Sequence, residues 1–183
     1  MTTMYPDLND WLHLHYIPKK MWERLAIPHH KLRYDWGAPL VVGKKWVDIG
    51  CVLGHATQEM NLRRPGDWTG FDIHEEMVTL AKKNFPELKF QLITNLLELP
   101  EKCFDTVWCT EVIEHIPDWE TFAAGLLHIT GQRLLLTTPS RWISDPGHLR
   151  VFSQAELARL FPGATVAPLE RYWSVVWDRP ENE

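Results

Sequence analysis

The stretch VDIGCVLGHATQEM, residues 47–60, decides the fold. An apolar run ends on Asp48, Gly50 and Gly54 follow, and the residues after Gly54 are typical of a helix. A strand, a tight turn and a helix in this order present the free N–H groups of the helix start to a ligand, and glycines let the backbone approach it closely. Val52 stands between the glycines. A β-branched residue is costly there if the turn needs a positive φ.

Strands and helices alternate along most of the chain. Asp118 and the pair Ser153 and Glu156 have the pattern of helix N-caps. The alternation requires crossovers, and it predicts an α/β fold with a mostly parallel sheet and helices on both faces. The predicted strands are 44–50, 68–73, 88–93, 104–110, 132–139, 164–170 and 172–177, and the predicted helices are 55–62, 75–85, 118–130 and 153–161.

Length and composition indicate one domain. The 183 residues are 45% hydrophobic, which is enough for one sizeable core and too little for two. We expect residues 1–43, which four prolines interrupt, to form an extension or lid over the carboxyl edge of the sheet. Residues 44–183 would form the core. Ligands of such a sheet bind in the loops after the strands.

Charge and cysteine content narrow the class of protein. A net charge of −5 does not favour nucleic acid as a partner. The three cysteines show no C-x-x-C spacing, so we expect buried thiols in a reducing compartment and neither disulfides nor a zinc cluster. No secretory signal or membrane-length apolar stretch is visible, which predicts a soluble cytoplasmic protein. We interpret the basic residues near the N-terminus as a solvated helix face; they are Lys19, Lys20, Arg24, Lys31 and Arg33.

Two further loops follow predicted strands. Asp72 ends the second strand, where a carboxylate can accept both hydroxyls of a ribose, although it could also cap the next helix. The fourth strand runs into Thr110, Glu111, Glu114 and His115. Burying these polar groups without partners is costly, so we expect them to line an open cleft.

The motifs in this order resemble those of class I S-adenosylmethionine (SAM)-dependent methyltransferases, and within them the ubiquinone-biosynthesis O-methyltransferase (type 11) group. The resemblance covers roughly residues 44–177. It rests on VDIGCVLG, GFDIHEEMVTLAKKN, FDTVWCTEVIEHIPD, LLLTTPS and HLRVFSQAEL. It implies a Rossmann-like three-layer α/β/α sandwich with a mostly parallel seven-stranded sheet. It also implies SAM as the cofactor, and methyl transfer to an oxygen or nitrogen of a small molecule.

The resemblance also implies a set of cofactor-binding residues. The loop after the first strand would lie under the amino-acid part of SAM, Asp72 would hold the ribose hydroxyls, and Ile73 would lie against the adenine. Asn95 stands where the family usually has an aspartate that contacts the adenine amine, and its side-chain oxygen can accept the same hydrogen bond. The complete set is Asp48, Gly50, Cys51, Gly54, Asp72, Ile73, Asn95, Leu96, Thr110 and Glu111.

An oxygen or nitrogen acceptor can require a base. His115 is the first candidate and His148 the second, because an imidazole suits proton transfer near neutral pH. Glu111, Glu114, His115 and His148 also resemble the E-x-x-E-H…H magnesium site of small-RNA 2′-O-methyltransferases. The same motif occurs in metal-free relatives, and the negative net charge does not favour RNA as a substrate. We therefore expect no metal.

Two other functions stay open. Val52 and Asn95 are compatible with a non-catalytic relative that kept the fold as a binding or partner subunit. A nicotinamide-dependent oxidoreductase is disfavoured because the G-x-G-x-x-G fingerprint fails at Val52 and His55. The sequence does not name the acceptor or the oligomeric state. An aromatic acceptor is one hypothesis, based on Trp22, Tyr34, Trp36 and Trp142.

Overall fold

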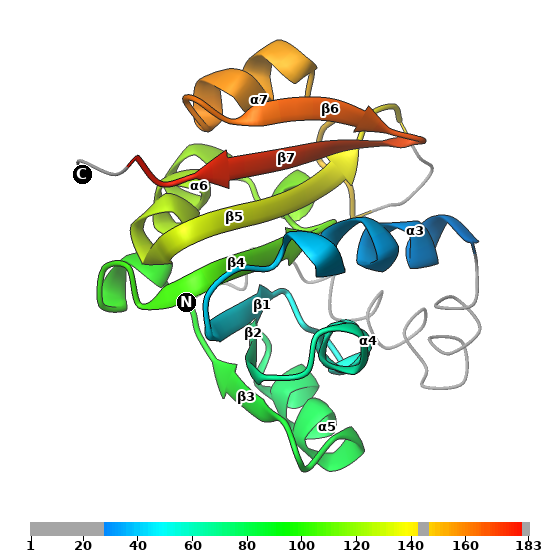
Figure 1. Ribbon diagram of the computed structural model, residues 1–183, viewed down its shortest axis with the longest axis vertical. Helices are drawn as coiled ribbons and strands as arrows, with labels where there is room; N and C mark the ends of the chain where they lie inside the picture. Colours follow the sequence, from blue (N-terminus) through cyan, green and yellow to red (C-terminus); the bar gives the residue numbers. More distant parts are fainter. Residues whose placement is uncertain (1–27, 143–146, 181–183) are drawn as a thin grey trace.

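The computed structural model describes residues 28–142 and 147–180, and its centre is a seven-stranded sheet of order β3-β2-β1-β4-β5-β7-β6 (Figure 1). Neighbouring strands from β3 to β5 are parallel, and β7 is antiparallel to both β5 and β6. This is the mostly parallel sheet that the sequence predicted. The strands are β1 (Lys45–Ile49), β2 (Asp67–Asp72), β3 (Lys89–Leu92), β4 (Phe104–Thr110), β5 (Thr130–Pro139), β6 (Thr165–Leu169) and β7 (Tyr172–Asp178).

Helices cover both faces of the sheet. Successive strand residues point to opposite faces, so Val107 and Trp108 of β4 belong to different clusters of the core. Val107 packs with α6 and α7, and Trp108 packs with α3 and α4. The helices are α3 (Pro28–Gly37), α4 (His55–Arg63), α5 (Glu75–Asn84), α6 (Trp119–Ile129) and α7 (Gln154–Leu160). The predicted three-layer sandwich is therefore correct.

The expected caps form at two helices. The Asp118 carboxylate accepts a hydrogen bond from the N–H of Thr121 at the start of α6. Ser153 and Glu156 form a reciprocal capping box at the start of α7. These local bonds explain why the sequence predicted the starts of both helices to within one residue.

Aromatic side chains hold α3 on the sheet. Tyr34 and Trp36 pack against Trp108, with ring centroids 6.2 and 6.1 Å apart. Tyr34 is therefore part of the core and Trp36 packs against it while remaining half-buried, and the hypothesis of an aromatic acceptor stays a prediction. Trp142 is exposed, and Trp22 lies outside the described residues.

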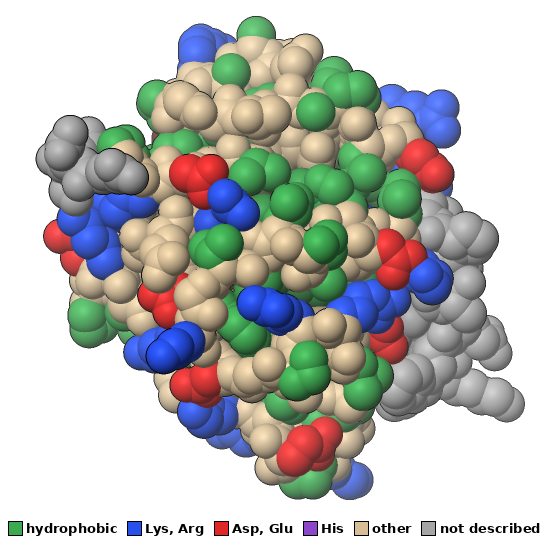
Figure 2. All heavy atoms as spheres, viewed as in Figure 1, with side chains coloured by type: hydrophobic (Ala, Val, Ile, Leu, Met, Phe, Trp, Pro, Cys, Tyr) green, Lys and Arg blue, Asp and Glu red, His purple; other side chains and the backbone are tan. Residues whose placement is uncertain are grey.

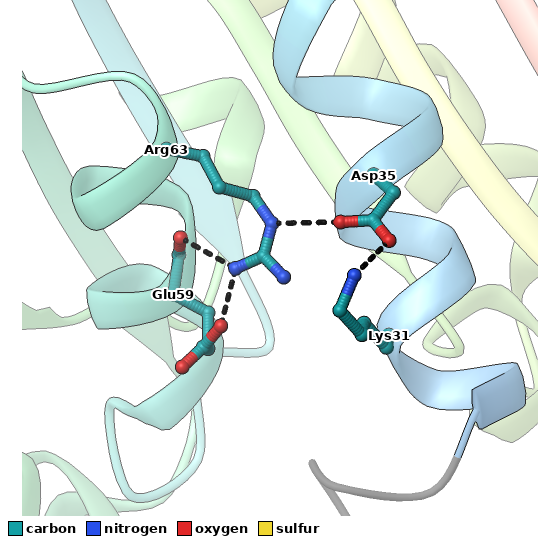
Figure 3. A network of polar contacts seen from close by, with 4 residues as sticks. All are labelled: Lys31, Asp35, Glu59 and Arg63. Carbon is teal, nitrogen blue, oxygen red and sulfur yellow. Dashed lines mark hydrogen bonds and ion pairs between the residues drawn. The ribbon is translucent and has the colours of Figure 1, made fainter.

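A polar network also joins α3 to α4 (Figure 3). Arg63 of α4 donates to Asp35 of α3 over 3.2 Å and to Glu59 one turn earlier, while Lys31 pairs with Asp35. Such exposed ion pairs contribute at most about 1 kcal/mol each. The network therefore orients the two helices, and the aromatic contacts supply most of the stabilisation.

Helix α3 corrects the prediction that Arg33 belongs to a solvated basic face. Arg33 is buried beside Glu111, so it is not part of a solvated basic face; the carboxylate and two aromatic rings give its charge partners inside the protein. Lys31 is exposed as expected, whereas Lys19, Lys20 and Arg24 lie outside the described residues. The division into an extension, 1–43, and a core stays a prediction.

One face of the molecule is shown with its side chains coloured by type in Figure 2. On the face in Figure 2, Lys and Arg side chains are interspersed with Asp, Glu and hydrophobic side chains of the described residues. Within residues 28–142 and 147–180, none of the helices has the length and apolar character that crossing a bilayer requires.

Candidate active site

The register of three strands brings the predicted cofactor residues to one edge. The pairing of β1 with β2 and with β4 ends at Ile49, so Gly50 leaves the sheet between Asp72 of β2 and Thr110 of β4. These are carboxyl ends of parallel strands, where ligands of open α/β sheets bind.

The loop between β1 and α4 is fixed by backbone hydrogen bonds. The N–H groups of Gly50 and Cys51 donate to the carbonyl of Phe71 over 2.8 and 3.0 Å. Gly50 has a φ of +77°, and a Cβ at this position would lie 2.5 Å from the side chain of Val112. Only glycine fits such a position. Cys51 is buried with a free thiol, as expected.

Val52 adopts the conformation that β-branched residues avoid. Its φ is +47°, and its N–H donates to the Asp72 carboxylate over 2.9 Å. A left-handed non-glycine residue costs about 1–3 kcal/mol and persists only where its surroundings impose it. The loop therefore keeps the backbone conformation of a glycine-rich turn, although the valine strains it.

We expect Val52→Gly to raise the free energy of unfolding by about 1 kcal/mol, because the strain relieved exceeds the extra entropy of glycine in the unfolded chain. Urea unfolding measures the change. Lys102→Gly is the matched control, since Lys102 has a φ of +56° in a turn remote from this loop. The control should leave SAM affinity unchanged, whereas Val52→Gly should tighten it. A destabilised Val52→Gly protein would show that the valine contributes more by packing than it costs in strain.

Asp48 lies beneath the loop. It is buried, and the Thr57 hydroxyl of α4 donates to it over 2.6 Å. Burial, more than any neighbouring charge, raises the pKa of Asp48 to about 7. This carboxyl group therefore changes its charge near neutral pH.

Asp72 presents a polar group, and the adjacent Ile73 presents an apolar surface. The Asp72 carboxylate accepts hydrogen bonds from the N–H of Val52 and the N–H of His74, and the His74 ring lies 3.0 Å from it. A carboxylate accepts about four hydrogen bonds, so room remains for a ribose hydroxyl. Ile73 is 55% exposed next to this buried acid. A flat apolar ligand such as adenine would cover it.

The segment after β3 carries Asn95 and Leu96. The Asn95 side chain caps the short 3₁₀ helix η2 (Leu96–Glu98) by accepting from the N–H of Leu97 over 3.0 Å, and it donates to Glu98. One lone pair of its oxygen is left for an adenine amine. Leu96 itself is part of the core, so it could offer only its backbone to a ligand.

Glu111 is the second strained residue at this edge. It has a φ of +57°, its N–H donates to the carbonyl of Thr137, and the Thr137 hydroxyl donates to its carboxylate. Arg33 lies 3.9 Å from the same carboxylate. Strain of this kind clusters at functional sites. Arg33 comes from a segment whose sequence gave no sign of this contact.

Glu114 is completely buried, which corrects the expectation that it lines an open cleft; its carboxylate has partners inside the fold. The Thr138 hydroxyl donates to its Oε2 over 3.1 Å, and His148 Nε2 lies 3.9 Å from its Oε1. Burial first, and then the charge of Glu111, raise the pKa of Glu114 well above its usual value.

The two candidate bases lie together. The ring centroids of His115 and His148 are 4.7 Å apart with an interplanar angle of 69°, and His115 Nδ1 donates to the carbonyl of Gly147 over 2.8 Å. Because a carbonyl only accepts, Nε2 of His115 carries the lone pair. Two histidines far apart in the sequence thus meet beside Glu114, in the 3₁₀ helix η3 (Ile113–His115) and in the segment after β5.

Comparison with known proteins gives the family. Residues 47–130 match the methyltransferase domain family. Over this segment the chain is similar to class I methyltransferases. The predicted resemblance is confirmed, and with it the Rossmann-like fold and SAM as the cofactor of the family.

Similar proteins extend the match. A ubiquinone biosynthesis O-methyltransferase of Stutzerimonas stutzeri (strain A1501) is 35% identical over 96 residues, which are 48% of this chain and 40% of that protein. The enzyme of the same name from Xanthomonas euvesicatoria pv. vesicatoria (strain 85-10) is 29% identical over 68% of this chain and 55% of its own length. The chain thus spans about half of these relatives or less.

A solved structure shares the fold. Magnesium protoporphyrin IX methyltransferase from Synechocystis PCC 6803, with bound S-adenosylhomocysteine (SAH), superposes with a TM-score of 0.68. The two chains are 19% identical, and the match covers 83% of this chain and 84% of the other.

Proposed function

We propose that this protein transfers the methyl group of SAM to an oxygen or nitrogen atom of a small-molecule acceptor. The observation that carries the proposal is the pairing of buried Asp72 with exposed Ile73, beside a loop held in glycine-like geometry. A ribose and an adenine need such a pair of contacts. Because Ile73 is an exposed large apolar side chain, it adds little to the core.

The residues of the carboxyl edge would bind and orient the cofactor. Asp48, Gly50, Cys51 and Gly54 would support its amino-acid part, Asp72 and Ile73 its nucleoside, and Asn95 with the Leu96 backbone its adenine edge. Thr110 and Glu111 would lie beside the methionine moiety. SAM supplies the reactive methyl group, and the chain supplies alignment and exclusion of water.

His115 is the candidate proton acceptor. The bond from its Nδ1 to Gly147 places the lone pair of the neutral ring on Nε2. His148 would hold the ring in place from the side. An acceptor hydroxyl or amine would then lose its proton to Nε2 as the new bond to carbon forms.

The small-molecule acceptor is supported by the relatives, which are named as O-methyltransferases. An RNA acceptor finds less support, because the net charge is −5. A non-catalytic role was motivated by Val52, whose loop nevertheless keeps the shape of a glycine turn. The nature of the acceptor and a cytoplasmic location stay predictions.

Calorimetric titration with SAM and SAH tests the proposal. We expect saturable binding of both, and a loss of at least about tenfold in affinity for Asp72→Ala, because hydrogen bonds to a charged group are worth roughly 1.5–3 kcal/mol. Asp67→Ala is the matched control at the other end of β2, where Asp67 is exposed and pairs with Lys89. It should bind SAM like the unmodified protein.

The outcomes separate two functions. Binding lost only in the Asp72 variant would place the cofactor as proposed, and acceptors could then be screened. No heat with either ligand at millimolar concentration would overturn the proposal and favour the non-catalytic role. Equal weakening by both substitutions would mean that general destabilisation, and not a ribose contact, controls binding.

A further inference from the structure

A hollow lies at the end of the sheet opposite the carboxyl edge, where β4 and β5 begin and β7 ends (Figure 1). Its volume is about 400 Å³, which is in the range of small-molecule sites. Its walls come from the loop before β1, from the starts of β4 and β5, and from the end of β7. The residues of the proposed cofactor site lie at the other ends of these strands, so the proposed methyl transfer does not use the hollow.

A bulge in β5 lies at the wall of the hollow. Phe104 of β4 pairs with Thr130 of β5, but two residues further along β4 the partner is three residues further along β5, at Arg133. The extra residue of β5 falls at Gly131 and Gln132, which both line the hollow. Bulges bend a strand, redirect its side chains and are enriched next to active sites. The start of β5 is therefore shaped for more than strand pairing.

Positive charge is in excess around the hollow. Three cationic side chains and one carboxylate line it: Lys102, Arg133, Arg179 and Asp178. Figure 2 shows Lys and Arg side chains gathered on the left of the view, at this end of the sheet. The whole chain has the opposite balance, with a net charge of −5. A local excess of positive charge in a concave site attracts anions.

Both guanidinium groups are held in place and still have donors for a ligand. Arg133 uses three of its five N–H groups, two on the Asp178 carboxylate and one on the carbonyl of Leu40. Arg179 donates from Nε and Nη2 to two backbone carbonyls where α6 ends, which leaves the donors of Nη1. A planar group that is already fixed loses little freedom when it binds an oxyanion.

Lys102 reaches the hollow from a strained turn. Its φ is +56°, a conformation that is costly for a residue with a side chain and that clusters at functional sites. Its N–H donates to the carbonyl of His128, which fixes the turn against the end of α6. Its ammonium group lies 3.6 Å from the exposed carboxylate of Glu101, and such a surface pair contributes little. Lys102 can therefore exchange this partner for a bound anion at low cost.

The carboxylates at the hollow oppose an anion only weakly. Asp105 lies beside the bulge, and its carboxylate accepts hydrogen bonds from the N–H groups of Lys44 and Lys45 and from the amide of Gln132. Its charge is thus compensated by its own donors. Asp178 is 60% exposed, so water and salt screen its charge.

We propose that this hollow binds the phosphate groups of a small molecule, with Lys102, Arg133 and Arg179 as the cationic contacts. The planar fork of an arginine matches the oxygens of a phosphate, and a lysine adds a point charge. An inorganic phosphate ion fills only part of a hollow of this volume, which favours a phosphate ester or a polyphosphate. The site goes beyond the proposed methyl transfer and does not depend on it.

Calorimetric titration of the full chain with pyrophosphate and with inorganic phosphate, at constant ionic strength, tests the site. We expect one pyrophosphate per chain, bound more tightly than inorganic phosphate. Lys102→Met should weaken pyrophosphate binding at least about tenfold, because a contact to a charged group is lost. Asp178→Asn should tighten it, because the substitution removes a facing negative charge and releases N–H groups of Arg133.

Lys89→Met is the matched control, because Lys89 begins β3 at the same end of the sheet, pairs with Asp67 and does not line the hollow. It should bind pyrophosphate like the unmodified protein, and circular dichroism shows whether each variant is folded. Equal weakening in the Lys89 and Lys102 variants would mean that pyrophosphate responds only to overall charge, which would overturn the site. Absence of heat at millimolar pyrophosphate would overturn it as well. Titration with SAM is read separately, so failure of this site and failure of cofactor binding are distinguishable.

Discussion

Replacing Trp108 with alanine is expected to lower the free energy of unfolding by about 3–5 kcal/mol. Trp108 is completely buried in the central strand β4, and it packs against Tyr34 and Trp36 of α3. Its ring also fills the space beside Gly37, where a Cβ would lie 1.9 Å from it. The substitution would leave a cavity where α3 meets the sheet, and such cavities are costly because the surroundings relax only partly.

Urea unfolding followed by circular dichroism measures this loss. Trp142→Ala is the matched control, because the Trp142 side chain is 63% exposed; it should change the unfolding free energy by less than about 0.5 kcal/mol. A Trp108→Ala protein that loses less than about 1 kcal/mol would mean that α3 is held mainly by its ion pairs with α4.

Most strands were predictable because the apolar pattern of consecutive residues indicates which faces of a strand are buried. FDTVWCT is a near-continuous apolar run, and β4 occupies Phe104–Thr110 with helices on both sides. The start of α7 was predictable for a similar reason, since Ser153 and Glu156 satisfy each other's backbone groups locally. The strand β4 depends on apolar contacts on both faces of the sheet, and the start of α7 depends on hydrogen bonds within one helical turn. Neither element depends on one particular distant residue.

The electrostatics of the site could not be predicted in this way. Arg33 appears in the sequence as one of several basic residues, yet it is buried against Glu111, which follows β4. Glu114 appears as a polar residue after a strand, yet the segment containing His148 covers it. Both outcomes depend on packing between distant segments, and no periodicity in either segment carries that information.

We expect the protein to become less stable as the pH rises from about 4 to about 7, because of Asp48. Its pKa is about 7 in the folded protein and 3.8 in its ordinary state. The folded state therefore binds this proton more tightly than the unfolded state does. The stabilisation is complete below pH 3.8 and is lost as the pH approaches 7; a difference of this size corresponds to about 4 kcal/mol.

Asp48→Asn separates this effect from other titrations. Asparagine keeps the size of the side chain and can still accept the Thr57 hydroxyl bond, but it does not ionise. Burial also raises the pKa of Glu114, so ionisation of Glu114 destabilises the folded state as the pH rises. Because both proteins contain Glu114, both should lose stability with rising pH. Urea unfolding at pH 5, 6, 7 and 8 should show a smaller loss for Asp48→Asn.

The difference between the two proteins should grow in favour of Asp48→Asn as the pH rises toward 7 and should level off above it. Parallel pH curves would contradict a raised pKa for Asp48. Excess SAM should reduce the difference, since the positive amino-acid part of the cofactor would favour the ionised carboxyl group beneath the loop. The strain at Val52 and the buried charge at Asp48 would then have one common cause. Both would be costs of holding the loop in the geometry that the proposed cofactor site requires.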